Sequence, residues 1–137
     1  MALEFTRVTF LRIYTGEDVI LGDEPLYKAI LKEARRLGFA GGTAIKALSG
    51  FSKQVRGGNN RISYFVSGVA DAPIIIDIVD EKERVASFLP WLEKNAKRSL
   101  VTVRETDILM TDYIRQRKQE LAQQKASNQP TMQVQQQ

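Results

Sequence analysis

The stretch Ala72–Asp80, APIIIDIVD, carries the clearest indication of the fold. It is a short, nearly continuous run of aliphatic residues, which is typical of a central strand covered on both faces. Pro73 has no backbone N–H for a sheet hydrogen bond, so it is expected at the start of the strand. Asp77 interrupts the run, and a carboxylate in such a strand needs a partner or an exposed face. We expect it to pair with an arginine of another strand, such as Arg12.

A helix and a final strand are predicted after this segment. Asp80 and Glu83 have the spacing of a capping box, which predicts that a helix opens here and continues through EKERVASFLPWLEKNAKR, residues 81–98. Pro90 is expected to kink or divide this helix. The stretch SLVTVRETDILM, residues 99–110, is predicted to be the last strand or strand pair. The buried face of the helix is predicted to consist of Val85, Phe88, Leu89, Leu92 and Ala96.

The N-terminal part of the chain repeats this alternation of strand and helix. Phe5–Gly16, FTRVTFLRIYTG, is rich in β-branched and aromatic residues and is predicted to be a strand. A loop follows, and Pro25 suits the first residue of a helix over residues 25–38, with Gly38 as its end. Residues 41–51, GGTAIKALSGF, are predicted to form the second strand.

The order strand, helix, strand, long loop, strand, helix, strand predicts the fold class. It is an α+β fold of the ferredoxin-like βαββαβ type, an antiparallel sheet with two helices on one face. The open face would carry Phe10, Tyr14, Ile75 and Val79, and that much apolar area indicates a subunit interface. We expect one domain over residues 1–112. Residues 113–137 are polar and rich in Gln, which predicts a short helix over 114–124 followed by a disordered tail.

The composition argues against several kinds of function. The 137 residues include no Cys and no His, and the net charge is +4. Disulfides, thiolate metal sites and a cysteine nucleophile are therefore excluded, and the commonest general base is missing. The acidic loop GEDVILGDE, residues 16–24, does not have the spacing of an EF-hand, so helix capping explains it better than a metal. We expect a protein that is not an enzyme, binds no metal, and is soluble and cytoplasmic.

Several segments taken together resemble the PII-like signalling proteins. They are LRIYTGED, EPLYKAILKEARRLGFAGGTAIKALSGF, APIIIDIVD and FLPWLEK, at the expected distances within residues 10–107. The resemblance implies a homotrimer whose sheets face the three-fold axis. It also implies clefts between subunits that bind an adenine nucleotide (ATP, ADP or AMP) as an effector, with no tightly bound cofactor. The family regulates its targets rather than catalysing reactions.

The long loop between the second and third strands corresponds to the family's T-loop, at about residues 52–63. This loop would contact a target protein, for which the family suggests a membrane transporter or channel, and would bring the protein to the membrane. Paired glycines and several cations suit an exposed segment that becomes ordered on a partner. The predicted partner-binding residues are Lys53, Gln54, Arg56, Gly57, Gly58 and Arg61.

The resemblance also places a nucleotide site at the base of this loop and in the turn before the last strand. The predicted nucleotide-binding residues are Gly50, Phe51, Ser52, Lys97, Arg98 and Arg104. Ser52 departs from the family, whose members often have a second glycine there. The structural alternatives are that Gly50 ends a strand, that Phe51 fills the core, and that Lys97 and Arg98 are solvated cations at a helix C-terminus.

Two alternative functions share the predicted fold. RNA-recognition modules have the same order of elements and stack bases on sheet aromatics, and ISYFVSGV, residues 62–69, is an aromatic stretch. It lacks the glycines of their motif, so we expect no nucleic-acid binding. The second alternative is a trimeric interaction scaffold that has no nucleotide ligand.

Overall fold

A computed structural model describes residues 2–50 and 72–128, so the predicted T-loop and the end of the tail lie outside the described residues. The described chain forms two compact units, residues 7–106 and a second unit made of both terminal segments. The elements in chain order are β1 (Phe5–Gly16), β2 (Ile20–Leu21), β3 (Glu24–Pro25), α1 (Leu26–Arg36), β4 (Thr43–Lys46), β5 (Pro73–Asp80), α4 (Lys82–Asn95), β6 (Leu100–Leu109) and α5 (Asp112–Asn128).

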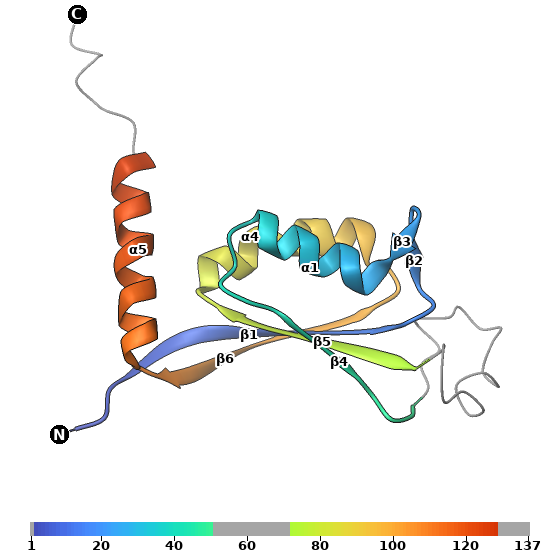
Figure 1. The fold of residues 1–137 in the computed structure, drawn as a ribbon, viewed down its shortest axis with the longest axis horizontal. Coiled ribbons are helices and arrows are strands. Elements are labelled where there is room, and N and C mark those ends of the chain that lie inside the picture. Colours follow the sequence, from blue (N-terminus) through green and yellow to red (C-terminus); the bar gives the residue numbers. More distant parts are fainter. Residues whose placement is uncertain (1, 51–71, 129–137) are drawn as a thin grey trace, which may run out of the picture. The chain divides into compact units, whose positions relative to one another are not determined.

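The main sheet has the strand order β4-β5-β1-β6, which is the order of a ferredoxin-like fold (Figure 1). β5 is antiparallel to both β1 and β4, and its Ile75 lies opposite Tyr14 on one side and Ile45 on the other. β6 also runs antiparallel to β1. The Thr102 hydroxyl donates a hydrogen bond to the Arg12 carbonyl, and the Arg104 guanidinium lies over the Phe10 ring, so residue numbers rise along β6 as they fall along β1. The predicted fold class is confirmed.

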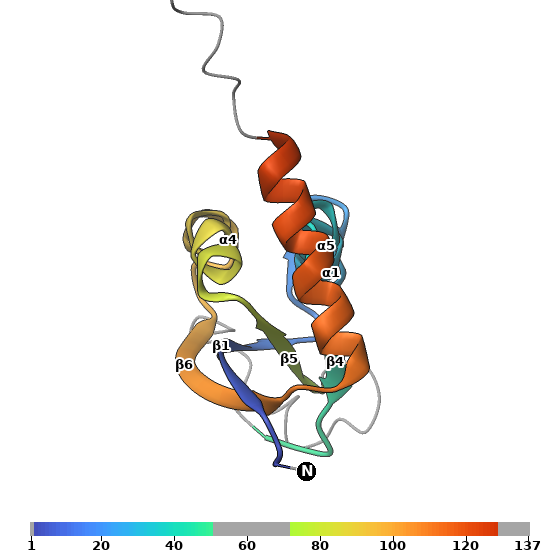
Figure 2. The same ribbon diagram turned by 90° about the vertical axis from the view of Figure 1, so that its left-hand side faces the viewer.

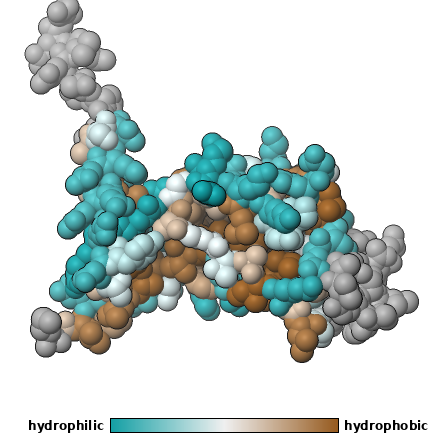
Figure 3. All heavy atoms as spheres, in the orientation of Figure 1, coloured by the Kyte–Doolittle hydropathy of each residue, from teal (hydrophilic) through white to brown (hydrophobic). Residues whose placement is uncertain are grey.

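The core lies between the sheet and the helices α1 and α4, which cover the same face (Figure 2). Alternate residues of the two central strands are buried there, including Leu11, Ile13 and Ile76 with no exposed surface. Val85, Phe88, Leu92 and Ala96 of the second predicted helical segment are buried and Leu89 packs against them, so that predicted face is confirmed. Hydrophilic residues line the outward side of the helices, and apolar residues gather beneath them (Figure 3).

The loop predicted over residues 17–24 contains a small hairpin. Ile20 pairs with Pro25 and Leu21 with Glu24, and Gly22 turns the chain with a φ of 66°. Because Pro25 belongs to this hairpin, its ψ is 137°, and the helix begins one residue later than predicted, at Leu26. The second strand, β4, is also much shorter than the predicted residues 41–51.

The capping box predicted for Asp80 and Glu83 is wrong. The helix begins at Lys82 and no side chain caps it. The Asp80 carboxylate is buried and accepts hydrogen bonds from the backbone N–H of Ala40 (3.1 Å) and of Glu81 (2.7 Å). Pro90 lies within α4, which continues to Asn95, so Pro90 does not divide the helix.

The second unit joins the N-terminal segment to the end of β6 and to α5. The Met110 N–H donates to the Glu4 carbonyl (2.8 Å), and Lys118 donates to the Thr6 hydroxyl (2.6 Å). Glu4 also forms a long ion pair with Arg115 at 3.9 Å. The helix is longer than the predicted residues 114–124, because it spans Asp112–Asn128.

Candidate functional site at the root of the long loop

The segment 51–71 leaves and re-enters the described structure at one end of the main sheet. The Ala47 N–H donates to the Pro73 carbonyl (2.9 Å), and the Glu17 N–H donates to the Ala72 carbonyl (3.0 Å). The ends of β1 and β4 and the start of β5 are thereby fastened together. Figure 1 shows this end beside the β2–β3 hairpin.

Gly50 lies at this root, against the first residue of β5. A Cβ atom added to Gly50 would lie 3.2 Å from Cγ of Pro73, which is a tight contact. This contact gives a packing reason for a glycine at the position, and the predicted phosphate contact of its backbone stays a prediction. Phe51 and Ser52 lie outside the described residues.

Lys97 and Arg98 are exposed in the turn between α4 and β6. The turn is held by the buried Ala96, whose carbonyl accepts the Ser99 N–H at 3.0 Å. Because α4 returns along the sheet after β5, this turn lies at the same end of the sheet as Gly50 (Figure 1). The topology therefore brings Gly50, Lys97 and Arg98 to the same end of the sheet.

Arg104 has a different position. Its guanidinium lies over the ring of Phe10, with Cζ 4.6 Å from the ring centroid. Phe10 lies opposite Val79, the last residue but one of β5. Both side chains are on the face of the sheet that the helices leave open. Arg104 is thus apart from Lys97 and Arg98 within one chain, and its contact with a nucleotide stays a prediction.

The open face is centred on the predicted ion pair between Arg12 and Asp77. Both oxygen atoms of the Asp77 carboxylate accept hydrogen bonds from the Arg12 guanidinium, each at 2.7 Å. The hydrogen bonds to Asp77 raise the pKa of Arg12 above its ordinary value, so the guanidinium stays charged. The ion pair is surrounded by the apolar residues that were predicted for this face, all of them partly or well exposed: Phe10, Tyr14, Ile75 and Val79.

Sequence reasoning missed an ion pair at the root of the loop. The Lys46 ammonium lies 3.0 Å from the Glu17 carboxylate, which is only 22% exposed. Glu17 belongs to the acidic loop and Lys46 to the second predicted strand, and no local pattern in the sequence connects the two. Another carboxylate of the acidic loop, Glu24, pairs with Lys32 on α1 at 2.9 Å.

Three other expectations concern a metal site, membrane-spanning helices and the residues that bind a target. Within residues 2–50 and 72–128 no group of three acidic side chains is placed to hold a metal ion. Over the same part of the chain no helix has the length and apolar character needed to cross a membrane. The predicted target-binding residues, from Lys53 to Arg61, lie outside the described residues.

Comparisons with known proteins give the family and its fold. The family DUF190, described as "Uncharacterized ACR, COG1993", matches residues 8–108. A UPF0166 protein of Aquifex aeolicus (strain VF5) is 28% identical over 99 residues, which are 72% of this chain and 90% of that protein.

Two solved structures are similar at lower identity. A PII-like signalling protein of Thermus thermophilus has a TM-score of 0.52 at 17% identity, covering 77% of this chain and 91% of that one. CPII of Thiomonas intermedia, a nitrogen regulatory PII-like protein bound to ADP, AMP and bicarbonate, has a TM-score of 0.52 at 20% identity. That match covers 78% of this chain and 92% of CPII. At these identities the likeness establishes a shared fold.

Proposed function

Because this chain belongs to the DUF190 family and has the fold of the PII-like signalling proteins, we propose that it is a regulatory protein that binds an adenine nucleotide. One observation carries the proposal: Gly50 at the root of the long loop and the cations Lys97 and Arg98 lie at the same end of the sheet. The CPII structure shows that this fold accommodates ADP and AMP in another protein. Exposed cations beside a backbone turn suit the phosphates of such a ligand.

We further propose that three copies of the chain assemble through the open face of the sheet. That face exposes apolar side chains around the Arg12–Asp77 ion pair, and partly exposed apolar surface of this kind marks an interface. Because the two charges neutralise each other within one chain, the centre of the face needs no counter-ion from a partner. A nucleotide bound at one edge would then lie close to a neighbouring copy, as the PII-like resemblance implies.

The segment 51–71 is proposed to carry the regulatory output to a target, with a membrane transporter or channel as the family-based candidate. The residues on either side of this segment are held in the sheet by two hydrogen bonds. The Glu17 N–H donates to the Ala72 carbonyl, and the Ala47 N–H donates to the Pro73 carbonyl. A ligand that binds at these residues changes the state of the segment only if it binds one state better than another. The protein acts in this proposal as a regulator and not as a catalyst.

Calorimetric titration with ATP, ADP and AMP, with and without magnesium, tests the proposal. We expect saturable binding to a trimer, and the double variant Lys97→Ala/Arg98→Ala should weaken it at least tenfold through the loss of charged hydrogen bonds. The variant Arg35→Ala/Lys82→Ala is the control, because it removes the same charge from exposed residues at the opposite end of the sheet. Equal affinity of both variants would show that Lys97 and Arg98 are not in the site.

Oligomeric state is measured on the same samples by native mass spectrometry. A folded trimer that binds no nucleotide would leave the alternative of an interaction scaffold. A folded monomer would overturn the proposed assembly. An RNA oligonucleotide in the same titration checks the expectation that the protein does not bind nucleic acid.

A further inference from the structure

We propose that Lys46 is a further anion-binding residue of this site and that Glu17 positions its ammonium group. The inference rests on the proposed nucleotide site and adds a residue that neither motif nor resemblance indicated. Its starting point is the 3.0 Å ion pair between these two side chains.

The ion pair holds the Lys46 ammonium group away from the strand to which Lys46 belongs. Lys46 is the last residue of the edge strand β4 and lies opposite Ile74 of β5. Glu17 directly follows β1, which is the next strand beyond β5. The ammonium group therefore reaches across the start of β5 to the end of β1.

This position is close to the turn that contains Lys97 and Arg98. That turn precedes β6, and β6 is the other neighbour of β1. Neighbouring strands are about 4.8 Å apart. The Lys46 ammonium and the turn lie on either side of the end of β1, so the distance between them is roughly the length of a diphosphate group. The Lys46 side chain lies on the side of the sheet that the helices cover, because Lys46 is opposite the buried Ile74, whereas Arg104 lies on the open side.

The chemistry of the pair allows an anion to bind beside it. The Lys46 side chain is 51% exposed, so solvent and ligands reach its ammonium group. An ammonium has three N–H donors, so it can contact Glu17 and also donate to a phosphate oxygen. Glu17 fixes the direction of the lysine, but its negative charge also repels the anion.

These opposing effects predict opposite results for the two residues. Lys46→Met removes the donor and leaves the Glu17 carboxylate near the phosphate, so we expect ADP affinity to fall at least tenfold. Glu17→Gln removes the negative charge and keeps an acceptor oxygen for Lys46, so we expect ADP to bind several-fold more tightly. A purely structural ion pair would lower stability in both variants and leave the affinity unchanged.

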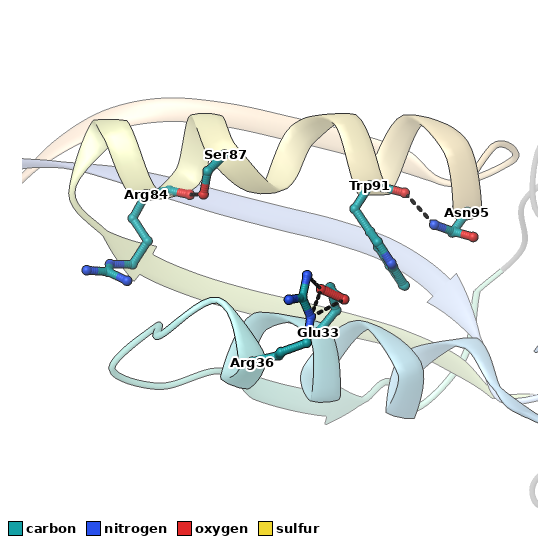
Figure 4. A network of polar contacts seen from close by, with 6 residues as sticks. All are labelled: Glu33, Arg36, Arg84, Ser87, Trp91 and Asn95. Atoms are coloured by element: carbon teal, nitrogen blue, oxygen red, sulfur yellow. Dashed lines mark hydrogen bonds and ion pairs between the residues drawn. The ribbon is translucent and has the colours of Figure 1, made fainter. Parts of the chain in front are cut away.

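The experiment is a calorimetric titration of the full chain with ADP and, separately, with inorganic pyrophosphate. The controls are Arg36→Met and Glu33→Gln, which break an ion pair within the last turns of α1, at the opposite end of the sheet (Figure 4). Both controls should bind ADP and pyrophosphate within twofold of the unsubstituted protein. Circular dichroism confirms that each variant is folded.

The outcomes separate the two proposals. If the unsubstituted protein binds ADP and Lys46→Met binds it equally well, the role of Lys46 is overturned and the nucleotide site stands. If pyrophosphate binds in a Lys46-dependent way and ADP does not bind, the nucleotide function fails and the anion site stands. Binding of neither ligand overturns both.

Discussion

The clearest test of the fold concerns Gly38, which follows the end of α1. Its φ is 88°, a left-handed conformation that costs a residue with a side chain about 1–2 kcal/mol. A Cβ atom at this position would also lie 2.6 Å from Nη1 of Arg84 on α4. That nitrogen donates a hydrogen bond to the Leu37 carbonyl (2.7 Å), and Figure 4 shows Arg84 on α4. Gly38→Ala must therefore displace the guanidinium, and losing a charged hydrogen bond costs about 1.5–3 kcal/mol.

We expect Gly38→Ala to lower the free energy of unfolding by about 2.5–5 kcal/mol, the sum of these two costs. Urea denaturation followed by circular dichroism measures the change. In an Arg84→Met background the guanidinium is absent, so the same substitution should cost only about 1–2 kcal/mol. Gly41→Ala is the matched control, because a Cβ there meets nothing within 4 Å and its φ is not positive. Equal costs of Gly38→Ala in both backgrounds would refute the steric argument, and a cost as small as that of Gly41→Ala would refute the whole reasoning.

Three further substitutions test the core, a buried hydroxyl and the open face. Phe88→Ala removes a fully buried ring, so unfolding by urea should become easier by about 3–5 kcal/mol, and a value below about 1 kcal/mol would contradict the packing described. Thr15→Val should raise stability by about 1 kcal/mol, because the buried hydroxyl has no hydrogen-bond partner in the described part of the chain; a loss in thermal unfolding would contradict this. Arg104→Ala should weaken subunit association in dilution experiments, because the side chain lies on Phe10 in the proposed interface; an intact trimer with weaker ADP binding would favour the nucleotide role instead.

The two central strands were predictable because β1 carries an alternating pattern and β5 is a nearly continuous run of aliphatic residues. In β1 the buried Leu11 and Ile13 alternate with Phe10 and Tyr14, so the pattern distinguishes the buried face from the open face. The partner of Asp77 was predictable for a related reason: a carboxylate among aliphatic residues needs a cation close by.

Other features depend on contacts that no local pattern contains. The β2–β3 hairpin has only two residues in each strand, too few for a periodic signal. Asp80 was expected to cap the next helix, but the N–H of Ala40, which is 40 positions away, binds its carboxylate instead. Local hydrogen-bond preferences were overridden here by the packing of the α1–β4 connection against the end of β5.

The candidate site was predictable only in part. Gly50 and the cations of the α4–β6 turn were predicted from the resemblance to the PII-like proteins, and their contact with a nucleotide stays a prediction. Glu17 and Lys46 meet only after the sheet has formed, so their separate positions in the sequence gave no reason to connect them.

The central place of β1 in the sheet also has a consequence for the newly synthesised chain. Both strands that pair with β1 are made after it, and 65 positions separate Arg12 from Asp77. At synthesis rates of about 5–20 residues per second, the first partner strand follows β1 from the ribosome after roughly 3–13 seconds. During this interval only α1 is available to cover the apolar side of β1, and both backbone edges of the strand are open to other chains. The yield of native protein should therefore depend on how well the nascent strand is protected on the ribosome, and not only on the stability of the finished fold.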